Sequence, residues 1–268
     1  MKVNNKVVVI TGAGNGMGRE MTLEFVRRGA KVYGVDMNEA ALQETEKLVG
    51  KKGAFAYQVL NITDRVAVAK LPAAVEAALG EADILVNNAG IIQPFVKVNT
   101  LEFADIDRVM NVNFNGPVNL TKAFLPIFLK RNSGQVANVS SMGGYGPVPG
   151  QTVYGASKAA VKLFTEGLRS ELLNTGVTVT LIYPGAIGTN IAKNSGVGMD
   201  MDADSAAASK FKTTPAPLAG KLMVDAIEAD APRAFIGSDA KLMDRMVRMM
   251  PVKAAELIAK QMGSLLKD

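Results

Sequence analysis

Short apolar runs recur along this chain, and each is separated from the next by a longer stretch in which apolar residues have helical spacing. The first six runs are unbroken rather than alternating, which is typical of parallel strands that are covered on both faces. The expected strands are Lys6–Ile10, Lys31–Val35, Ala54–Val59, Ile84–Asn87, Gln135–Val139, Val177–Ile182 and Ala234–Ile236, and the expected helices cover residues 16–29, 39–50, 64–79, 101–131 and 152–174. This alternation predicts an α/β fold with one doubly wound parallel sheet of about seven strands.

The chain has no internal repeat, low-complexity tract or linker that would divide it. Its 268 residues, 48% of them hydrophobic, are enough for one well-buried core, so we expect a single domain over residues 1–268. A membrane-spanning helix needs about 18 or more uninterrupted apolar residues, and the sequence has no such run. The segment before the first expected strand is shorter than a secretory signal. We therefore expect a cytoplasmic protein.

Histidine and cysteine are both absent from the sequence. Without cysteine there is no disulfide, no thiol nucleophile and no thiolate metal site. Without histidine there is no Ser-His-Asp triad, no imidazole base and no His-ligated zinc, so we expect no metal centre. Acid–base chemistry near neutral pH must then come from lysine, tyrosine, aspartate or glutamate with a shifted pKa.

A glycine-rich segment, Thr11–Gly18, follows the first expected strand directly and begins the first expected helix. Gly12, Gly16 and Gly18 keep the turn tight, let the backbone approach a pyrophosphate, and let helix and strand pack closely. Free N–H groups at the helix N-terminus then face the phosphates. This arrangement is typical of a Rossmann-like dinucleotide-binding fold. An anionic dinucleotide also accounts for the net charge of +5, since no nucleic-acid motif accompanies the basic residues and nucleic acid is not an expected partner.

Asp36 ends the second expected strand, where an acidic side chain can accept hydrogen bonds from the ribose hydroxyls of the adenosine half. A 2′-phosphate at this place would meet like charge, and no arginine follows Asp36 to offset it. We therefore expect NAD rather than NADP. Arg19 leaves NADP open, because it lies near the start of the first helix and can swing toward a phosphate. A second interpretation is that Asp36 merely caps the next helix, since aspartate is a good N-cap.

Five motifs follow one another in order: Thr11-Gly12-x-x-x-Gly16-x-Gly18, Asn87-Asn88-Ala89-Gly90, Ser141, Tyr154-x-x-x-Lys158 and Tyr183-Pro184-Gly185. Together they resemble the short-chain dehydrogenase/reductase family over roughly residues 5–190. The resemblance implies an NAD(P)-dependent alcohol dehydrogenase or ketone reductase that acts on a small molecule. It also implies a homodimer or homotetramer, with the expected helices at 101–131 and 152–174 forming the dimer contact.

Tyr154 and Lys158 lie four residues apart on an expected helix, so their side chains share one face. A phenol with a pKa of about 10 is a poor base at pH 7, and a nearby ammonium together with an oxidised nicotinamide ring would lower that pKa. By resemblance, Tyr154 is the general acid/base and Ser141 orients the substrate oxygen. Lys158 also bonds the cofactor ribose, and Asn113 helps to relay the proton.

Each of these assignments has an alternative. Ser140 competes with Ser141, and Asn111 competes with Asn113; in both cases the family's spacing favours the later residue. Asn113 can also simply bond the backbone of a kinked helix. Lys158 can be an ordinary solvated helix lysine, although Tyr154 four residues earlier argues against this.

Further residues are assigned to the cofactor by resemblance. Those after the fourth strand line its adenosine side and steady the central sheet, and those after the sixth strand pack on the nicotinamide and bond its carboxamide. The family commonly has an aspartate at the place of Asn61 to bond the adenine amino group, and an asparagine carbonyl can accept that bond too. The expected cofactor-binding residues are Gly12, Asn15, Gly16, Met17, Gly18, Asp36, Asn61, Ile62, Asn88, Ala89, Gly90, Tyr154, Lys158, Pro184, Gly185, Ile187 and Thr189.

Two segments depart from the regular alternation. Residues 188–220 carry glycines, a cluster of aspartate and alanine, and two prolines, and we favour a substrate lid over a passive loop. Residues 238–268 replace the short glycine-rich tail of many family members and predict a methionine-rich helical extension, interrupted at Pro251. The extension has three interpretations: packing on the core or on another subunit, closure over a lipophilic pocket, or contact with a membrane surface.

The leading hypothesis is an NAD-dependent oxidoreductase that transfers a hydride between nicotinamide and a secondary alcohol or ketone of lipophilic character. The first alternative is a 3-oxoacyl thioester reductase that uses NADPH, and Asp36 argues against its cofactor. The second is a non-catalytic dinucleotide-binding sensor or scaffold. A pure binding module would need none of Ser141, Tyr154 and Lys158, so the complete set favours an enzyme.

Overall fold

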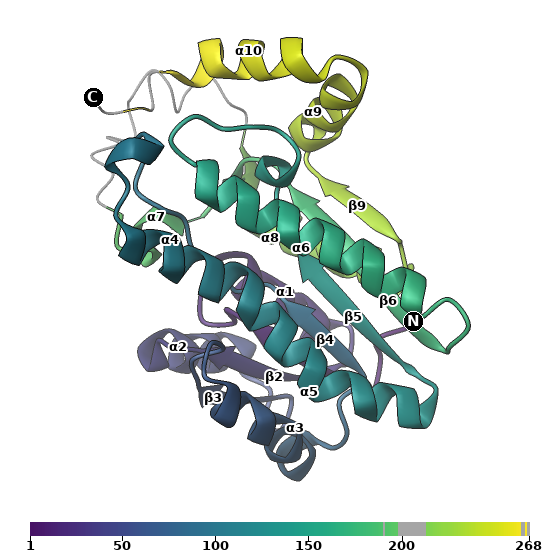
Figure 1. Ribbon diagram of the computed structural model, residues 1–268. Helices are drawn as coiled ribbons and strands as arrows, with labels where there is room; N and C mark the ends of the chain where they lie inside the picture. Colours follow the sequence, from purple (N-terminus) through teal and green to yellow (C-terminus); the bar gives the residue numbers. More distant parts are fainter. Residues whose placement is uncertain (190, 198–212, 264–265, 267–268) are drawn as a thin grey trace.

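A parallel sheet forms the centre of the computed structural model, which describes residues 1–189, 191–197, 213–263 and 266 (Figure 1). Its strands run in the order β3-β2-β1-β4-β5-β6-β9, and every neighbouring pair is parallel. The strands are β1 (Val7–Thr11), β2 (Lys31–Asp36), β3 (Phe55–Val59), β4 (Ile84–Asn87), β5 (Gly134–Val139), β6 (Val177–Pro184) and β9 (Arg233–Ile236). All seven expected strands are present, and the Rossmann-like, doubly wound α/β fold is confirmed.

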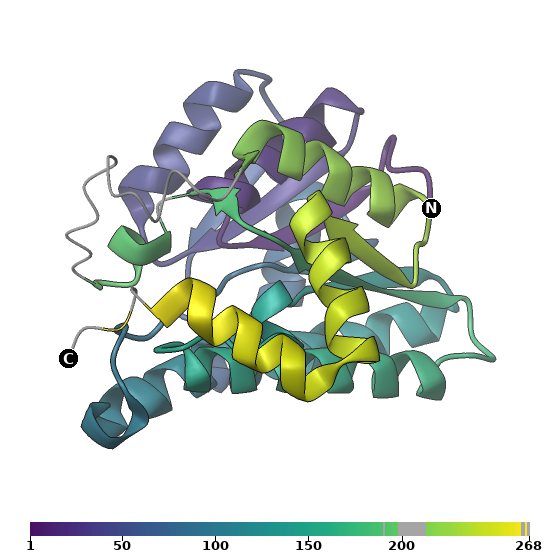
Figure 2. The same cartoon turned by 90° about the horizontal axis from the view of Figure 1, so that it is seen from above.

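Helices cover both faces of this sheet, as the unbroken apolar strands require. The helices are α1 (Gly16–Arg27), α2 (Glu39–Val49), α3 (Arg65–Leu79), α4 (Phe103–Met110), α5 (Gly116–Arg131), α6 (Thr152–Glu171), α7 (Ile191–Asn194), α8 (Ala216–Glu228), α9 (Ser238–Met249) and α10 (Pro251–Met262). Phe25 of α1 and Ile227 of α8 belong to the core on one face, whereas Leu71, Phe124 and Leu168 of α3, α5 and α6 belong to the core on the other. Figure 2 shows α8 and the teal helices α5 and α6 on opposite sides of the sheet. Among the described residues, no helix is both long and apolar enough to cross a membrane.

The expected helix over residues 101–131 is instead three consecutive segments. A π-helical turn, Asn111–Asn115, separates α4 from α5. Pro117 explains the interruption, because it has no N–H to donate to the Asn113 carbonyl four residues earlier, and its ring crowds that carbonyl. Such π turns are rare and are frequently found at functional sites.

The segment expected to form a lid ends earlier than predicted. Residues 216–220 belong to α8, and Pro217 lies in the first turn of that helix, where proline is favoured. The two ends of the segment are held together by a short parallel pair, β7 (Ile187–Gly188) and β8 (Thr214–Pro215). Residues 190 and 198–212 lie outside the described part of the chain, so the lid itself stays a prediction.

The expected helical extension is present as α9 and α10. Proline begins α10 at residue 251 rather than leaving a gap, because its fixed φ suits the first turn of a helix. Ala254 and Ile258 of α10 are buried, whereas Met249 and Val252 at the α9–α10 junction are mostly exposed. Both helices lie at the top of the molecule as it is drawn in Figure 1.

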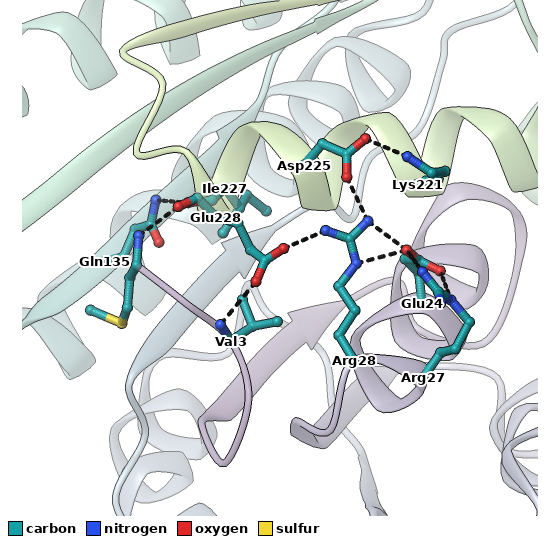
Figure 3. Close-up of polar contacts among 10 residues, drawn as sticks. Val3, Glu24, Arg27, Arg28, Gln135, Lys221, Asp225, Ile227 and Glu228 are labelled. Atoms are coloured by element: carbon teal, nitrogen blue, oxygen red, sulfur yellow. Dashed lines mark hydrogen bonds and ion pairs between the residues drawn. The ribbon is translucent and has the colours of Figure 1, made fainter.

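A charged network joins α1 to α8 (Figure 3). The guanidinium of Arg28, just after α1, donates to Glu24, to Asp225 at 2.6 Å and to Glu228 at 2.5 Å. Glu228 also accepts a hydrogen bond from the backbone N–H of Val3 at 3.2 Å. This network ties the start of the chain and α1 to a helix that lies about two hundred residues later in the sequence.

Candidate active site

A cavity of about 670 Å³ opens at the carboxyl ends of β1, β2 and β4, where the strand order reverses. Doubly wound sheets bind ligands at this place, and the volume is typical of small-molecule and cofactor sites. The predicted cofactor residues that line it are Gly12, Asn15, Gly16, Met17, Asp36, Ile62, Asn88, Ala89, Gly90 and Thr189. Lining residues that the sequence did not single out are Val35, Met37, Asn38, Glu39, Ala41, Leu60, Ile91, Val112, Ile191 and Asn194.

The glycine-rich turn forms one wall of the cavity. Gly12 and Gly16 have φ angles of 70° and 50°, a conformation that glycine adopts without steric cost. Gly18 is equally constrained, because a Cβ there would overlap the carbonyl oxygen of Gly12. Asn15 caps α1 by accepting a hydrogen bond from the N–H of Gly16 at 2.7 Å. The start of α1 therefore presents its positive end to the cavity, which suits a pyrophosphate.

Asp36 also lines the cavity, at the end of β2. Its carboxylate accepts hydrogen bonds from the N–H groups of Gly14 and Asn38, both at 3.0 Å. The N-cap of α2 is Asn38, so Asp36 does not serve as the cap of that helix. Arg19 donates to the carbonyl oxygens of Gly14 at 2.7 Å and Ala41 at 3.3 Å, and it is absent from the described lining of the cavity. The guanidinium thus braces the glycine turn against α2.

Two asparagines after β4 join the cofactor side to the rest of the sheet. Asn88 donates from its backbone N–H and from its side-chain amide to Thr11, at 3.0 and 2.9 Å. Its Oδ1 is buried without a partner among the described residues, so an acceptor is available at the cavity wall. Asn87 donates to Asn138 of β5 at 2.8 Å, and Asn138 donates to Thr165 of α6 at 2.9 Å. This chain of amides connects β4, β5 and α6.

Other predicted cofactor residues lie outside the described lining. Asn61 is exposed, and its Oδ1 accepts hydrogen bonds from the N–H and the hydroxyl of Thr63 at 3.0 and 2.9 Å. The acceptor that was expected for the adenine amino group is therefore already bonded. After β6, the N–H of Gly185 donates to Ile236 at 2.9 Å, and Ile187 packs against the core.

The predicted catalytic side chains meet at the start of α6. The Ser141 hydroxyl accepts a hydrogen bond from the N–H of Gly143 at 3.1 Å, and a Cβ placed on Gly143 would lie 3.5 Å from Ser141 Oγ and 3.4 Å from the Tyr154 ring, so the two side chains lie side by side. Lys158, which is 4% exposed, lies with its Nζ 6.0 Å from the centroid of the Tyr154 ring and donates to the carbonyl oxygen of Val139 at 3.0 Å. The hydroxyl of Ser140 instead donates to the backbone carbonyl of Lys158 at 2.8 Å. The geometry thus places Ser141 rather than Ser140 against the tyrosine.

Asn113 is fully buried in the π-helical turn. Its Oδ1 accepts from the N–H of Ile91 at 2.8 Å, and its Nδ2 donates to the carbonyl of Ile91 and to Ser157, both at 2.9 Å. Asn111 is exposed, so the turn directs only the later asparagine inward. Asn113 does bond backbone, as the alternative interpretation stated, but it also joins the segment after β4 to the helix that carries Tyr154.

Burial shifts the pKa values of both titratable groups at this site. It raises the pKa of Tyr154 above its usual value, and the neighbouring Ser141 hydroxyl acts in the opposite direction without compensating. Burial lowers the pKa of Lys158 to about 8. From the sequence we expected the pKa of Tyr154 to be lowered by Lys158 and by an oxidised nicotinamide ring. In the polypeptide alone, exclusion of water from the phenolate outweighs the other effects.

Gln93 was missed by the sequence analysis. Its Oε1 accepts hydrogen bonds from the N–H groups of Val153 and Tyr154 at 2.8 and 2.9 Å, and its Nε2 donates to Gly150 at 3.1 Å. The N-cap residue of α6, Gln151, provides no side-chain cap of its own. Gln93 therefore caps α6 from sixty residues away. A polar glutamine directly after two isoleucines was the available signal in the sequence.

A family model of the short chain dehydrogenases matches residues 6–199. The chain belongs to the short-chain dehydrogenase/reductase family. SadH of Mycobacterium tuberculosis, whose name marks it as an oxidoreductase, is 36% identical over 260 residues, covering 95% of this chain and 94% of SadH. The 3-oxoacyl-(acyl-carrier-protein) reductase FabG of Thermotoga maritima is 38% identical over 193 residues, covering 70% of this chain and 77% of FabG.

Solved structures show the same relationship. A short-chain dehydrogenase/reductase from Burkholderia phymatum in complex with NAD superposes with a TM-score of 0.83 and 26% identity, covering 94% of this chain and 96% of the other. A metagenomic short-chain oxidoreductase in complex with NADP has a TM-score of 0.66 and 29% identity, covering 70% and 86%. This short-chain dehydrogenase/reductase is thus an oxidoreductase with an NAD(P)-binding Rossmann fold, and its structural relatives include complexes with either dinucleotide.

Proposed function

We propose that this short-chain dehydrogenase/reductase uses NAD to interconvert a secondary alcohol and a ketone, with Tyr154 as the general acid/base. The observation that carries the proposal is the meeting of three side chains from two elements, the loop after β5 and α6. The loop after β5 brings Ser141 beside Tyr154, and α6 places Lys158 one turn further along the same helix face. A module that only binds a dinucleotide has no use for this arrangement.

The residues around the cavity fit a dinucleotide. The N-terminus of α1, with Gly12 and Gly16, would hold the pyrophosphate, and Asp36 would accept hydrogen bonds from the adenosine ribose. The unpartnered Oδ1 of Asn88 offers a further acceptor. When bound, the cofactor supplies a nicotinamide ring that accepts or returns the hydride.

The protein's own part in the reaction is to orient one oxygen and move one proton. During oxidation the hydroxyl of the substrate passes its proton to Tyr154, and during reduction the same group returns it. Ser141 bonds the substrate oxygen and fixes its distance from the tyrosine. The positive charge of Lys158 favours the phenolate, and Asn113 holds the helix and the segment after β4 in register.

The preference for NAD rests on two acidic groups in one wall of the cavity. Asp36 and Glu39 both line it, and a 2′-phosphate bound there would face their negative charges. Arg19 is engaged with the carbonyl oxygens of Gly14 and Ala41 and so does not offset them.

Tyr154→Phe tests the catalytic assignment. Loss of the proton-transferring hydroxyl should lower turnover by at least about 100-fold on a panel of aliphatic, steroid and acyl alcohols, while NAD affinity stays close to that of the wild type. Tyr57→Phe removes a hydroxyl away from the site and serves as the matched control. Substantial turnover in the Tyr154 variant would refute the assignment, and a wild type that reduces no cofactor on any substrate would favour a sensor or scaffold instead.

A second candidate function is reduction of a 3-oxoacyl thioester. The similarity to the reductase of Thermotoga maritima favours it, and Asp36 speaks against the NADPH that we associate with this reaction. Parallel assays with NADH and NADPH on a 3-oxoacyl thioester and on a simple lipophilic ketone separate the two candidates.

We also propose that two copies associate through α4, α5 and α6, as the family resemblance implies. Phe103 at the start of α4 is 82% exposed and Leu163 on α6 is 68% exposed, so both helices offer a large apolar side chain to a second copy. Replacing both by aspartate should shift the protein from dimer to monomer in analytical ultracentrifugation. An unchanged mass would refute this contact.

A further inference from the structure

The first turn of α9 lies beyond the residues that the family model matches, yet it contacts the segment after β6 that the family resemblance assigns to the cofactor. Asp239 is the second residue of this helix, and its Oδ2 accepts a hydrogen bond from the backbone N–H of Ala186 at 2.6 Å. Ala186 belongs to the segment after β6 that is assigned to the nicotinamide half of the cofactor. The C-terminal extension therefore holds a piece of backbone at the site.

Both backbone polar groups of Ala186 are hydrogen-bonded. Its N–H bonds the carboxylate of Asp239, and its carbonyl oxygen accepts from the N–H of Thr214 at 2.8 Å. The preceding residue, Gly185, donates to Ile236 at 2.9 Å. Three separate parts of the chain, β9, α9 and the residue that begins β8, thus hold two consecutive residues of this segment.

Two glycines make the space that the carboxylate occupies. A Cβ on Gly185 would overlap both carboxylate oxygens of Asp239, and a Cβ on Gly237 would overlap one of them. Gly237 also has a φ of 98°, which glycine tolerates and other residues rarely adopt. The glycine of the Tyr183-Pro184-Gly185 motif is therefore matched to an aspartate more than fifty residues later.

The same turn of α9 holds the loop that carries the catalytic serine. The hydroxyl of Tyr145, four residues after Ser141, donates to the carbonyl oxygen of Ala240 at 2.6 Å. Its ring lies edge-on to Tyr183 with the centroids 5.2 Å apart. One helical turn thus contacts the serine loop and the segment after β6 at adjacent residues.

We propose that Asp239 is a positioning residue of this enzyme, which acts through the N–H of Ala186 to hold the nicotinamide half of the cofactor. The inference rests on the proposed function and on the family resemblance, which assigns Pro184, Gly185, Ile187 and Thr189 to the nicotinamide. The adenosine half is held by the start of α1 and the end of β2, which Asp239 does not contact. Loss of its carboxylate should therefore weaken one half of the site and spare the other.

The test compares two ligands by calorimetry: NAD, and ADP-ribose, which lacks the nicotinamide ring. Asp239→Ala should lower the affinity for NAD about tenfold, which is the effect of losing one hydrogen bond to a charged acceptor. The affinity for ADP-ribose should change by less than about twofold. Asp239→Asn should restore NAD affinity to within about threefold, because an amide oxygen can accept from the same N–H. Asp244→Ala is the matched control on the same helix, where the carboxylate pairs with Arg248, and both affinities should stay unchanged.

Gly185→Ala provides an independent variant, since its methyl group would displace the carboxylate and produce the same split between the two ligands. Equal weakening of NAD and ADP-ribose in Asp239→Ala would overturn the proposal and leave a merely structural role. Unchanged affinity for both ligands would overturn it as well. A wild-type protein that binds neither ligand would refute the proposed function. If the wild type binds both ligands but the variants do not lose NAD affinity selectively, only the role of Asp239 is refuted.

Discussion

Lys158→Met tests whether the buried ammonium is held at a cost to stability. Burial lowers the pKa of Lys158 from 10.5 to about 8, and the side chain is 4% exposed, so little solvent screening applies. Each pKa unit corresponds to about 1.4 kcal/mol, so keeping this group charged at pH 7 costs the folded state about 3 kcal/mol. Methionine keeps an apolar stem of similar shape and removes the charge. Removing the charge should therefore stabilise the folded state by about 3 kcal/mol, and losing the hydrogen bond to Val139 should reduce that stabilisation by about 1 kcal/mol.

The pKa of Lys158 determines how the free energy of unfolding changes with pH. Below pH 8 both the folded and unfolded chains hold the proton, and the full cost is present. Between about pH 8 and 10.5 the unfolded chain retains a proton that the folded chain has released, so the free energy of unfolding rises with pH. Above 10.5 the cost has gone, because neither state is charged.

Urea unfolding of the cofactor-free protein at a series of pH values measures this difference. At pH 7 the methionine variant should be about 2 kcal/mol more stable than the wild type, although it turns over far more slowly. As the pH rises to 10.5, the free energy of unfolding of the wild type should increase by about 3 kcal/mol relative to that of the variant. Contributions from the other titrating groups cancel between the two proteins. A gap that stays constant over this range would refute the reasoning.

Three further substitutions test other parts of the structure. Asp36→Asn should raise the affinity for NADP relative to NAD by at least about tenfold, because one negative charge facing the 2′-phosphate is removed; calorimetry with both dinucleotides measures the ratio, and an unchanged ratio contradicts the assignment. Gln93→Leu should lower the free energy of unfolding by about 3 kcal/mol and reduce kcat, because two N–H groups at the start of α6 lose their acceptor. A variant with the kcat of the wild type would show that this cap does not position Tyr154. Arg28→Ala should lower the free energy of unfolding by about 1–2 kcal/mol without changing KM, since the partners of Arg28 are partly exposed (Figure 3); a change in KM would reveal coupling to the cofactor site.

The fold could be predicted because its elements are encoded locally. Each strand is a short unbroken apolar run. The glycines after β1 indicate the positive φ angles of the turn, because other residues rarely adopt them. The motifs around Tyr154 likewise depend on residues within a few positions of one another. Local pattern and final structure agree wherever the constraint is a strand, a turn or one helical face.

The rest depends on contacts that no local window contains. The π-helical turn arises because Pro117 removes a helical donor for Asn113, whereas the apolar spacing across both residues still predicts one continuous helix. Pro215 and Pro217 are typical of a loop and equally of a helix start, so the predicted insertion was extended past Ala216, where α8 begins. Gln93 reaches across sixty residues to α6, and Asp239 reaches across fifty-three residues to Ala186. Such pairs become visible only once the sheet has brought their elements together.

The pairing of α1 with α8 has a consequence for how the protein is made. Phe25 of α1 and Ile227 of α8 share one core, and Arg28 bonds Asp225 and Glu228 above it. During synthesis, the glycine-rich turn and α1 leave the ribosome long before α8 exists, so the apolar face of α1 waits for a partner some two hundred residues away. We expect nascent chains that stop before α8 to bind chaperones and to bind no dinucleotide tightly. Chains that extend beyond β9 should bind the dinucleotide tightly and no longer bind chaperones.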